Sequence, residues 1–416
     1  MLKSELLEII ANGENSGVEF KRDDLRPEQL GKEIVALANF QGGRVLLGVE
    51  DDGTISGIQR ADLETWVMDT VFGRYVHPLI LPFYEEVELD DGMRVAVVSI
   101  TQGTAKPYVL RNNQREEIYI RLGSTSRLAT REQQARLFEI GGMLHSEILP
   151  VSGTSVDNLD HERLADYLVN IAGDAQAPAS QEDWQRRLCG LGLMVEREDG
   201  APVCTLAGLV LFGRSPRRSL RQAGVRWMSF VGDSKDYQAQ DDALLDAPLT
   251  ALWEGRPGAG RQLIEAGLIE RLADRMRPFI SEEGIASNAG LRRETEYRYP
   301  LDAIREAILN ALVHRDWTRA IEVEVVNYSD RLEVTSPGAL QNSMTIDKML
   351  AGQRSPRNPI IVEIMRDYGY VDMRGMGVRR KIVPLTLDYS GKDASFELTD
   401  DFLRVVIPAR LSNQGD

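Results

Sequence analysis

Acidic side chains and one lysine gather around a short extended segment near the amino terminus. Glu14 precedes a predicted strand that contains Glu19 and Lys21. Because alternate residues of a strand share a face, Glu19 and Lys21 point the same way. Asp51 follows a second predicted strand, over residues 44–49. If the two strands pair, three carboxylates and a lysine converge on one place.

Neighbouring carboxylates repel one another and bind a hard cation such as Mg²⁺ or Mn²⁺. A bound divalent ion polarises a phosphoryl oxygen and activates water, and a lysine offsets the negative charge that develops. The sequence therefore favours a metal-dependent nuclease site, in which Glu14, Glu19 and Asp51 hold the metal. A purely structural role at a strand edge and a turn is the alternative for these residues.

A second candidate site lies on an amphipathic helix predicted over residues 301–313. Glu306 and Asn310 are four residues apart and share one face of this helix. A carboxylate and an amide one turn apart suit a general base and a Mg²⁺ ligand. The alternative is a pair that only faces solvent.

Glycines farther along the chain could complete a nucleotide site. Gly375 and Gly377 open a basic helix, where backbone N–H groups can cradle phosphate. They follow Ser336 and Gly338 after an irregular segment of 36 residues, which we expect to form a lid. This order is more specific than a lone Gly-x-Gly turn.

A basic stretch interrupts a chain whose net charge is −15. Residues 101–138 carry seven basic residues against three acidic ones. If nucleic acid binds, it must use such a local patch against an unfavourable global field. Lys106, Arg121 and Arg127 are the candidate phosphate contacts, and a solvated face is the alternative.

Several function classes are excluded. No G-x-x-x-x-G-K-[ST] motif occurs, so the chain is neither a P-loop ATPase nor a P-loop helicase. The triplet His314-Arg315-Asp316 resembles a kinase catalytic loop, but Ile321 stands where such a loop needs Asn. Four isolated histidines and two cysteines offer no zinc site and no disulfide framework. With no long apolar run, we expect a cytoplasmic protein that does not engage membranes.

The elements that position these residues predict an α+β fold with three domains. Helix 27–38 and strands 44–49, 95–100 and 118–121 build a mixed α/β domain over residues 1–150. Residues 151–295 read as a mainly helical linking region. It contains an apolar strand over 206–212 and a possible winged-helix element over 184–212. Residues 296–416 carry the helix over 301–313 and strands over 321–326, 331–335 and 403–407, an α/β sandwich.

The amino-terminal motifs resemble the Schlafen-type AlbA-like domain over about residues 10–140. The resemblance rests on three stretches in order: residues 14–21 (ENSGVEFK), residues 36–51 (ALANFQGGRVLLGVED) and residues 119–124 (YIRLGS). In Schlafen nucleases an E-x4-E-F-K box and a later Asp form an acidic triad that cleaves RNA. The resemblance implies that Glu14, Glu19 and Asp51 form this triad, with Glu50 as the neighbouring candidate. Many bacterial relatives are described only as DNA-binding.

The carboxyl-terminal motifs resemble the GHKL ATP-binding fold, and more narrowly the divergent ATPase domain called RecG-like C-terminal. This resemblance rests on residues 299–316 (YPLDAIREAILNALVHRD), 336–338 (SPG) and 357–359 (RNP). The resemblance implies Glu306 for water activation, Asn310 for Mg²⁺, Ser336 and Gly338 for adenine, and Gly375 and Gly377 for phosphate. One departure is Ser336, which stands where GHKL proteins usually place an Asp.

Together these features predict an ATP-binding, nucleic-acid-processing protein. The leading hypothesis is a metal-dependent RNA or DNA endonuclease, regulated by the GHKL-type site, with a role in phage defence. The alternative is a nucleotide-sensing transcriptional regulator that binds DNA without cleaving it. We lean towards an enzyme, with ATP and Mg²⁺ or Mn²⁺ as cofactors, nucleic acid as partner, and a homo-oligomeric state.

Overall fold

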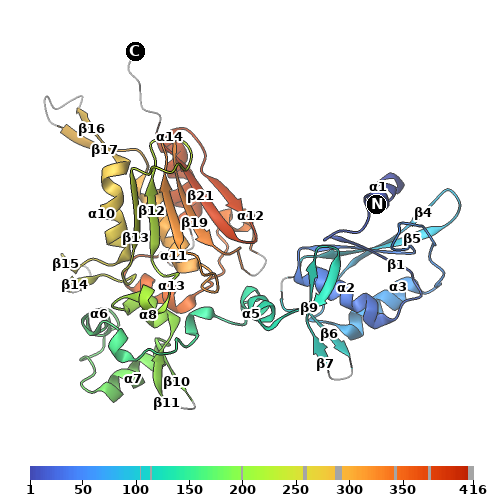
Figure 1. The fold of residues 1–416 in the computed structure, drawn as a ribbon, viewed down its shortest axis with the longest axis horizontal. Helices are drawn as coiled ribbons and strands as arrows, with labels where there is room; N and C mark the ends of the chain where they lie inside the picture. The colour runs from blue at the N-terminus through green and yellow to red at the C-terminus, as the bar shows by residue number, and fades with distance from the viewer. Residues whose placement is uncertain are drawn as a thin grey trace. The chain divides into compact units, whose positions relative to one another are not determined.

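The fold is described from a computed structural model, which covers residues 1–103, 105–112, 115–197, 200–255, 260–285, 293–341, 344–372 and 376–410. These residues form two compact units, 1–144 and 145–416. The chain mixes helices and sheets, as the predicted α+β class requires (Figure 1). None of the helices in these ranges is long and apolar enough to cross a membrane.

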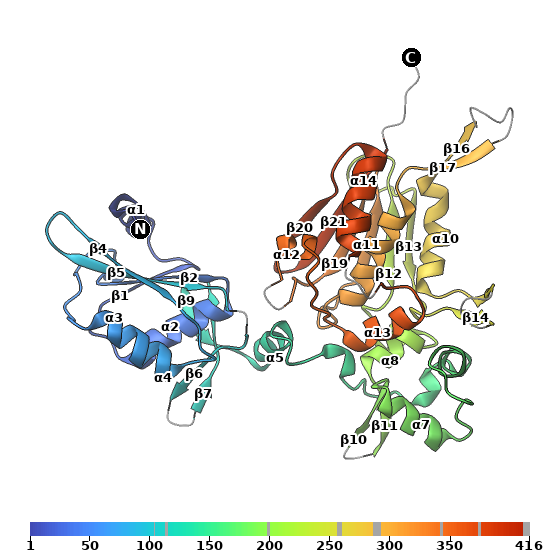
Figure 2. The same ribbon diagram turned by 180° about the vertical axis from the view of Figure 1, so that it is seen from behind.

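The N-terminal unit is built on a four-stranded sheet in the order β1-β2-β5-β4. Strands β1 and β2 are parallel, and the other neighbours are antiparallel. Figures 1 and 2 show α1 and α2 on opposite sides of this sheet. The bounds are α1 (Lys3–Asn12), β1 (Val18–Lys21), α2 (Pro27–Asn39), β2 (Gly42–Leu47), β4 (Phe83–Glu88) and β5 (Arg94–Thr101).

Smaller elements complete this unit, whose described residues include three apolar clusters. The bounds are α3 (Leu63–Thr65), η1 (Trp66–Phe72), α4 (Gly73–Tyr75), β3 (Val76–His77), β6 (Val109–Asn112), β7 (Arg115–Glu117), β8 (Tyr119–Leu122), β9 (Thr125–Leu128) and α5 (Arg131–Ile140). Asn39, at the end of α2, donates to the carbonyl oxygens of Tyr108 and Tyr119 at 2.8 and 2.9 Å. This buried amide fixes the start of the β8–β9 hairpin beside α2.

The second unit is built on a six-stranded sheet in the order β13-β12-β18-β19-β21-β20. Only the β12–β18 pair is parallel. Figure 2 shows α10, α11 and α14 in front of these strands, so the helices form one layer against the sheet. The bounds are β12 (Val225–Ser229), β13 (Asp241–Leu245), α10 (Leu268–Ile280), α11 (Leu301–His314), β18 (Val323–Asn327), β19 (Arg331–Pro337), α14 (Val383–Ser390), β20 (Ser395–Leu398) and β21 (Phe402–Pro408).

The remaining elements of this unit lie before and between those of the sheet. They are η2 (Ser146–Ile148), η3 (Val156–Asn158), α6 (His161–Asp166), η4 (Tyr167–Ile171), α7 (Gln181–Gly190), β10 (Met194–Arg197), β11 (Gly200–Cys204), α8 (Leu206–Phe212), α9 (Pro216–Ser219), β14 (Leu252–Glu254), β15 (Gln262–Glu265), β16 (Ser281–Ile285), β17 (Arg293–Tyr297), α12 (Ile346–Leu350), α13 (Pro359–Asp367) and η5 (Val378–Ile382). Thus the segment expected to be an irregular lid contains two helices, α12 and α13.

The predicted strand over 206–212 is wrong, because Leu206–Phe212 is the helix α8. All seven residues of α8 are buried, so their apolar run has no alternation that separates a helix from a strand. The Thr205 hydroxyl accepts a hydrogen bond from the Gly208 N–H and caps the helix. The helix-plus-hairpin pattern just before it is present as α7, β10 and β11. The range predicted to be mainly helical also supplies strands β12 and β13 to the large sheet.

Candidate functional site

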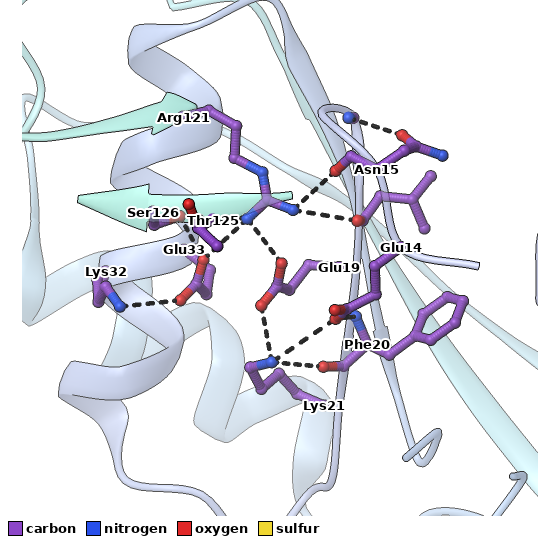
Figure 3. Close-up of polar contacts among 12 residues, drawn as sticks. Glu14, Asn15, Glu19, Phe20, Lys21, Lys32, Glu33, Arg121, Thr125 and Ser126 are labelled. Atoms are coloured by element: carbon purple, nitrogen blue, oxygen red, sulfur yellow. Dashed lines mark hydrogen bonds and ion pairs between the residues drawn. The ribbon is translucent and has the colours of Figure 1, made fainter. Parts of the chain in front are cut away.

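The structure brings the four predicted N-terminal residues together around one ammonium group. The Lys21 Nζ lies 2.7 Å from a Glu19 oxygen, 3.6 Å from Asp51 and 3.8 Å from Glu14. The parallel pairing of β1 with β2 produces this arrangement, since Lys21 is opposite Leu47 and Asp51 lies in the turn just beyond. Figure 3 shows Glu14, Glu19 and Lys21 pointing toward one another.

The electrostatics of this cluster follow from partial burial. Burial raises the pKa of Glu14, although its oxygen accepts a 2.8 Å hydrogen bond from the Phe20 N–H, which opposes the rise. Burial alone would lower the pKa of Lys21. Its hydrogen bond to Glu19 and the charges of Glu19, Glu14 and Asp51 outweigh that effect, so the pKa of Lys21 is raised. The ammonium is therefore charged at neutral pH and compensates the acids around it.

Arg121 holds the buried side of the same cluster. Its side chain is fully buried and lies 2.6 Å from Glu19 and 3.2 Å from Glu33. It also donates to the backbone oxygens of Asn15 and Val18 at 2.8 and 3.2 Å (Figure 3). The guanidinium thus fixes the Glu19 carboxylate relative to the start of β1. It faces this network rather than solvent, so it is not placed to receive a phosphate in this conformation.

Sequence reasoning missed Glu33, which lies on α2 and is 6% exposed. Its carboxylate accepts hydrogen bonds from Ser126 and Arg121. A signal was present in the sequence, because Glu33 is three residues after Leu30 and four before Leu37 on the apolar side of the helix. A carboxylate at such a position needs a buried partner.

The other predicted residues of this unit lie apart from the cluster. Lys106 is 5% exposed and donates to the Phe40 carbonyl oxygen at 2.8 Å. Arg127 is exposed on β9, with no ion pair among the described residues. Glu50, the alternative to Asp51, lies 3.6 Å from Arg22 instead. Of the three predicted phosphate contacts, only Arg127 presents its charge to solvent.

The donors of the acidic cluster fit a divalent metal by type, since Mg²⁺ and Mn²⁺ prefer carboxylate oxygens. The position between the carboxylates, however, is taken by the Lys21 ammonium. Within the described ranges, no group of three or more His, Cys, Asp or Glu residues is arranged to hold a metal ion. A metal at this place therefore requires the ammonium of Lys21 to move aside.

The second unit contains a cavity of about 290 Å³. A cavity of this size is near the lower end of the range of small-molecule pockets. Five predicted residues are among those that line it: Glu306, Asn310, Ser336, Gly338 and Gly377. Gly375 lies outside the described residues.

At one place on this cavity wall, Glu306 is held by polar contacts. Asn310 Nδ2 donates to one carboxylate oxygen at 3.3 Å, and the Lys381 ammonium lies 3.4 Å from the other. Gly377 packs against the same side chain so closely that a Cβ there would lie 1.7 Å from a Glu306 oxygen. The helical backbone of Gly377 and the glutamate therefore fit only because residue 377 has no side chain.

Ser336 and Gly338 line the cavity at the end of β19. The Ser336 hydroxyl donates to the Ala311 carbonyl oxygen at 3.1 Å. Its proton is thereby engaged, and its lone pairs remain to accept a hydrogen bond from a ligand. Gly338 has φ +97°, and a Cβ there would lie 2.4 Å from the Cβ of Asp316. Only glycine suits this left-handed, crowded position.

The kinase-like triplet has a structural role in this unit. Arg315 is 1% exposed and donates to the backbone oxygens of Gln222, Arg319 and Ile321. Burial lowers the pKa of Arg315 to about 10. Burial and the charge of Arg357 lower the pKa of His314, which lines the cavity, to about 4. His314 is therefore neutral at pH 7.

Comparisons with known proteins match two regions of the chain. Residues 14–130 match the family model "Schlafen, AlbA_2". Residues 320–407 match the model described as "Putative ATP-dependent DNA helicase recG C-terminal". The resemblances predicted from the sequence motifs are thus confirmed, and the chain joins a Schlafen AlbA_2 domain to a RecG C-terminal-like region. Domains of these types indicate a nucleic-acid-related function with nucleotide binding of the ATPase type.

Solved structures that are similar to this chain include one that covers most of it and one that covers less than a third of it. A crystal structure of the DIP2311 protein from Corynebacterium diphtheriae is 20% identical over 98% of this chain and 80% of that chain, with a TM-score of 0.44. A solution structure of the N-terminal domain of a RecG-related protein from Nitrosomonas europaea is 20% identical over 30% of this chain and 92% of that chain, with a TM-score of 0.24. No curated protein matches the chain.

Proposed function

We propose that this protein is an ATP-regulated endonuclease that cleaves RNA or DNA at the N-terminal acidic cluster. The observation that carries the proposal is the convergence of Glu14, Glu19 and Asp51 on Lys21, with Arg121 holding Glu19 from the buried side. A role in phage defence is the biological setting that the Schlafen resemblance implies.

In this proposal each side chain has a separate task. Glu14, Glu19 and Asp51 would hold Mg²⁺ or Mn²⁺, which supplies an activated water and polarises the phosphoryl oxygen. Lys21 leaves the carboxylates and stabilises the negative charge that develops on the scissile phosphate. Arg121 keeps the Glu19 carboxylate in place while Lys21 moves, because its contacts to Asn15 and Val18 are to the backbone.

The cavity of the second unit would hold ATP as the regulatory nucleotide. Glu306 is placed to orient water, and Asn310 Oδ1 remains available to a cation, since Nδ2 donates to Glu306. The Ser336 hydroxyl donates its proton to the Ala311 carbonyl oxygen, so its own oxygen can accept a hydrogen bond from the amino group of adenine. In guanine it would instead face a carbonyl oxygen, which cannot donate a hydrogen bond. The serine in place of the usual Asp is therefore compatible with a preference for ATP over GTP.

A substrate panel tests this proposal. The full-length protein is incubated with labelled tRNA, single-stranded DNA and duplex DNA, each with Mn²⁺, Mg²⁺ or EDTA and with or without ATP. We expect metal-dependent cleavage of at least one substrate and a change in its rate on addition of ATP. A mobility shift without cleavage under every condition would refute the nuclease.

One observation favours a second candidate, a nucleotide-sensing regulator that binds DNA without cutting it. The Lys21 ammonium already occupies the place between the three carboxylates, at distances of 2.7–3.8 Å from their oxygens. A site that stays closed in this way would bind nucleic acid without metal chemistry. In the substrate panel this candidate predicts ATP-dependent shifts of duplex DNA and intact substrate throughout.

A further inference from the structure

A shallow groove of about 490 Å³ crosses one face of the N-terminal sheet, away from the acidic cluster. Four of its lining residues form a row of cross-strand neighbours. Val18 pairs with Arg44, Arg44 with Ser99, and Ser99 with Phe83. Residues paired in this way lie on the same face, so the row spans all four strands. At about 4.8 Å per strand spacing, it is about 14 Å long.

Helix α1 packs on this face but leaves the row open. Leu6 of α1 is fully buried in one cluster with Phe20, Leu46 and Val97, which form the neighbouring row of the sheet. Beyond that row, Arg44 is exposed and Phe83 is 64% exposed. A large aromatic ring and a cation therefore lie on an otherwise regular sheet surface without cover from the described part of this unit.

The charge of the groove is opposite to that of the protein. Arg44 is the one charged residue among the described residues that line it, and no carboxylate does so. Within the described ranges, the Arg44 side chain makes no ion pair, whereas the chain as a whole carries a net charge of −15. An anion is the natural partner for a cation left free in such a setting.

We propose that this groove binds single-stranded nucleic acid, with one base stacked on Phe83 and a backbone phosphate at Arg44. Aromatic rings on an open sheet beside basic side chains are the general means by which proteins hold unpaired bases. A duplex presents no free base face to Phe83, so the groove selects single strands. This inference rests on the proposed function in nucleic-acid processing and adds the class of substrate.

The position of the row connects the groove to the acidic cluster. The row ends at Val18 on β1, which is an edge strand of the sheet. Glu19 is the next residue and points to the opposite face because side chains alternate along a strand. A single strand that crosses the groove and bends around the β1 edge would thus bring its next phosphates to Glu19 and Lys21.

Oligonucleotide binding to the full-length protein tests the inference, measured by fluorescence anisotropy in EDTA so that no cleavage occurs. The variants are Phe83→Ala, Phe83→Tyr and Arg44→Ala. Leu79→Ala is the matched control, since Leu79 is 66% exposed in the same segment but does not line the groove. Each variant must melt at the temperature of the wild type.

We expect Phe83→Ala to weaken binding of a single strand by about 5- to 150-fold, the range for loss of one base–aromatic stack. Phe83→Tyr and Leu79→Ala should bind as the wild type does. Arg44→Ala should reduce the slope of the logarithm of the binding constant against the logarithm of salt concentration by about 0.7, the value for one phosphate contact to a single strand. Binding of duplex DNA should not respond to Phe83→Ala.

Wild-type affinity in the Phe83→Ala variant would overturn the inference. If that variant also changed from a dimer to a monomer in light scattering, the groove would instead be an interface with a second copy of the chain. A wild-type protein that binds no nucleic acid at all would refute the proposed function itself, so the two failures are distinguishable.

Discussion

Arg121 links the chemistry of the acidic cluster to the stability of the N-terminal unit. It joins two buried carboxylates, Glu19 and Glu33, to the backbone at the start of β1. The sequence placed Arg121 in a basic stretch, which suggested a phosphate contact at the surface. The run of basic residues in the sequence does not reveal that the side of the β8–β9 hairpin that carries Arg121 is covered by the rest of the unit. Glu33, the partner that buries Arg121, lies 88 residues earlier in the chain.

Arg121→Ala should therefore act first on stability. Removing one partner of a buried ion pair leaves uncompensated charge, so we expect a loss of about 3–5 kcal/mol in the free energy of unfolding. Arg127→Ala is the control, because its exposed side chain should change stability by less than about 0.5 kcal/mol. Urea denaturation of both variants measures the difference. Equal stability of the two variants would contradict the structural role of Arg121.

His314 should give the second unit a measurable pH dependence. Its pKa is lowered to about 4 in the folded state, mainly by burial, against an ordinary value of 6.5. Between these values the unfolded chain binds more protons, so the free energy of unfolding falls as pH drops from about 6.5 to about 4. His314→Asn removes this titrating group, so the slope of the free energy of unfolding against pH should decrease by up to the contribution of one proton. Identical slopes of stability against pH in the two proteins would contradict the burial of a neutral imidazole.

The elements were predicted well for the two amphipathic helices and for three apolar strands, two of which, β2 and β5, contain continuous buried runs. The prediction failed for one apolar run of seven residues that is a buried helix. Helices α2 and α11 and strands β2, β5 and β19 follow the residues that their spacing indicated. Helix α8 was predicted as a strand, because seven consecutive buried residues carry no period. The contacts of Gly377 with Glu306 could not be predicted either, since they depend on how the η5 segment packs against α11.

Gly377→Ala tests that packing. A Cβ 1.7 Å from the Glu306 carboxylate must displace either the side chain or the helix. We expect ATP hydrolysis to fall by at least about tenfold, as expected when a catalytic group is misplaced by about 1 Å. Gly190→Ala, at the end of α7, is the control because a Cβ there meets open space. Unchanged hydrolysis in Gly377→Ala would remove Glu306 from the proposed mechanism.

Across the whole molecule, the chain joins a nucleic-acid-related domain to an ATPase-type region. Each unit has its own core and its own candidate site. The motifs in the sequence were sufficient to predict both domain types, because they carry fixed residues at fixed spacing. The convergence of Lys21 with the three acids was predicted on the condition that the two strands pair, and β1 and β2 do pair. The position of the Lys21 ammonium between the carboxylates, where a metal was expected, was not predicted, because it depends on side-chain placement that strand pairing does not fix.

The coupling between ATP and nucleic acid is a property of the full chain. Asn310→Ala should remove the proposed Mg²⁺ ligand, so Mg-ATP binding measured by calorimetry should be lost. Glu306→Gln should keep binding but slow hydrolysis. Asn310→Ala should also abolish any effect of ATP on cleavage, while cleavage without ATP should be unchanged. Tight Mg-ATP binding by Asn310→Ala would contradict the nucleotide site.

The central claim is that the acidic cluster cleaves nucleic acid, and a comparison of Glu19→Ala with Glu50→Ala tests it most directly. Glu50 is a neighbouring carboxylate that pairs with Arg22 outside the cluster. Both variants must first be shown to be folded at the assay temperature, since Glu19→Ala removes one partner of the buried pair with Arg121 and should melt at a lower temperature than the wild type. Cleavage of the preferred substrate is then measured with Mn²⁺, and binding is measured in EDTA. We predict that Glu19→Ala loses cleavage but binds as tightly as the wild type, whereas Glu50→Ala retains both. Full cleavage by Glu19→Ala would contradict the account.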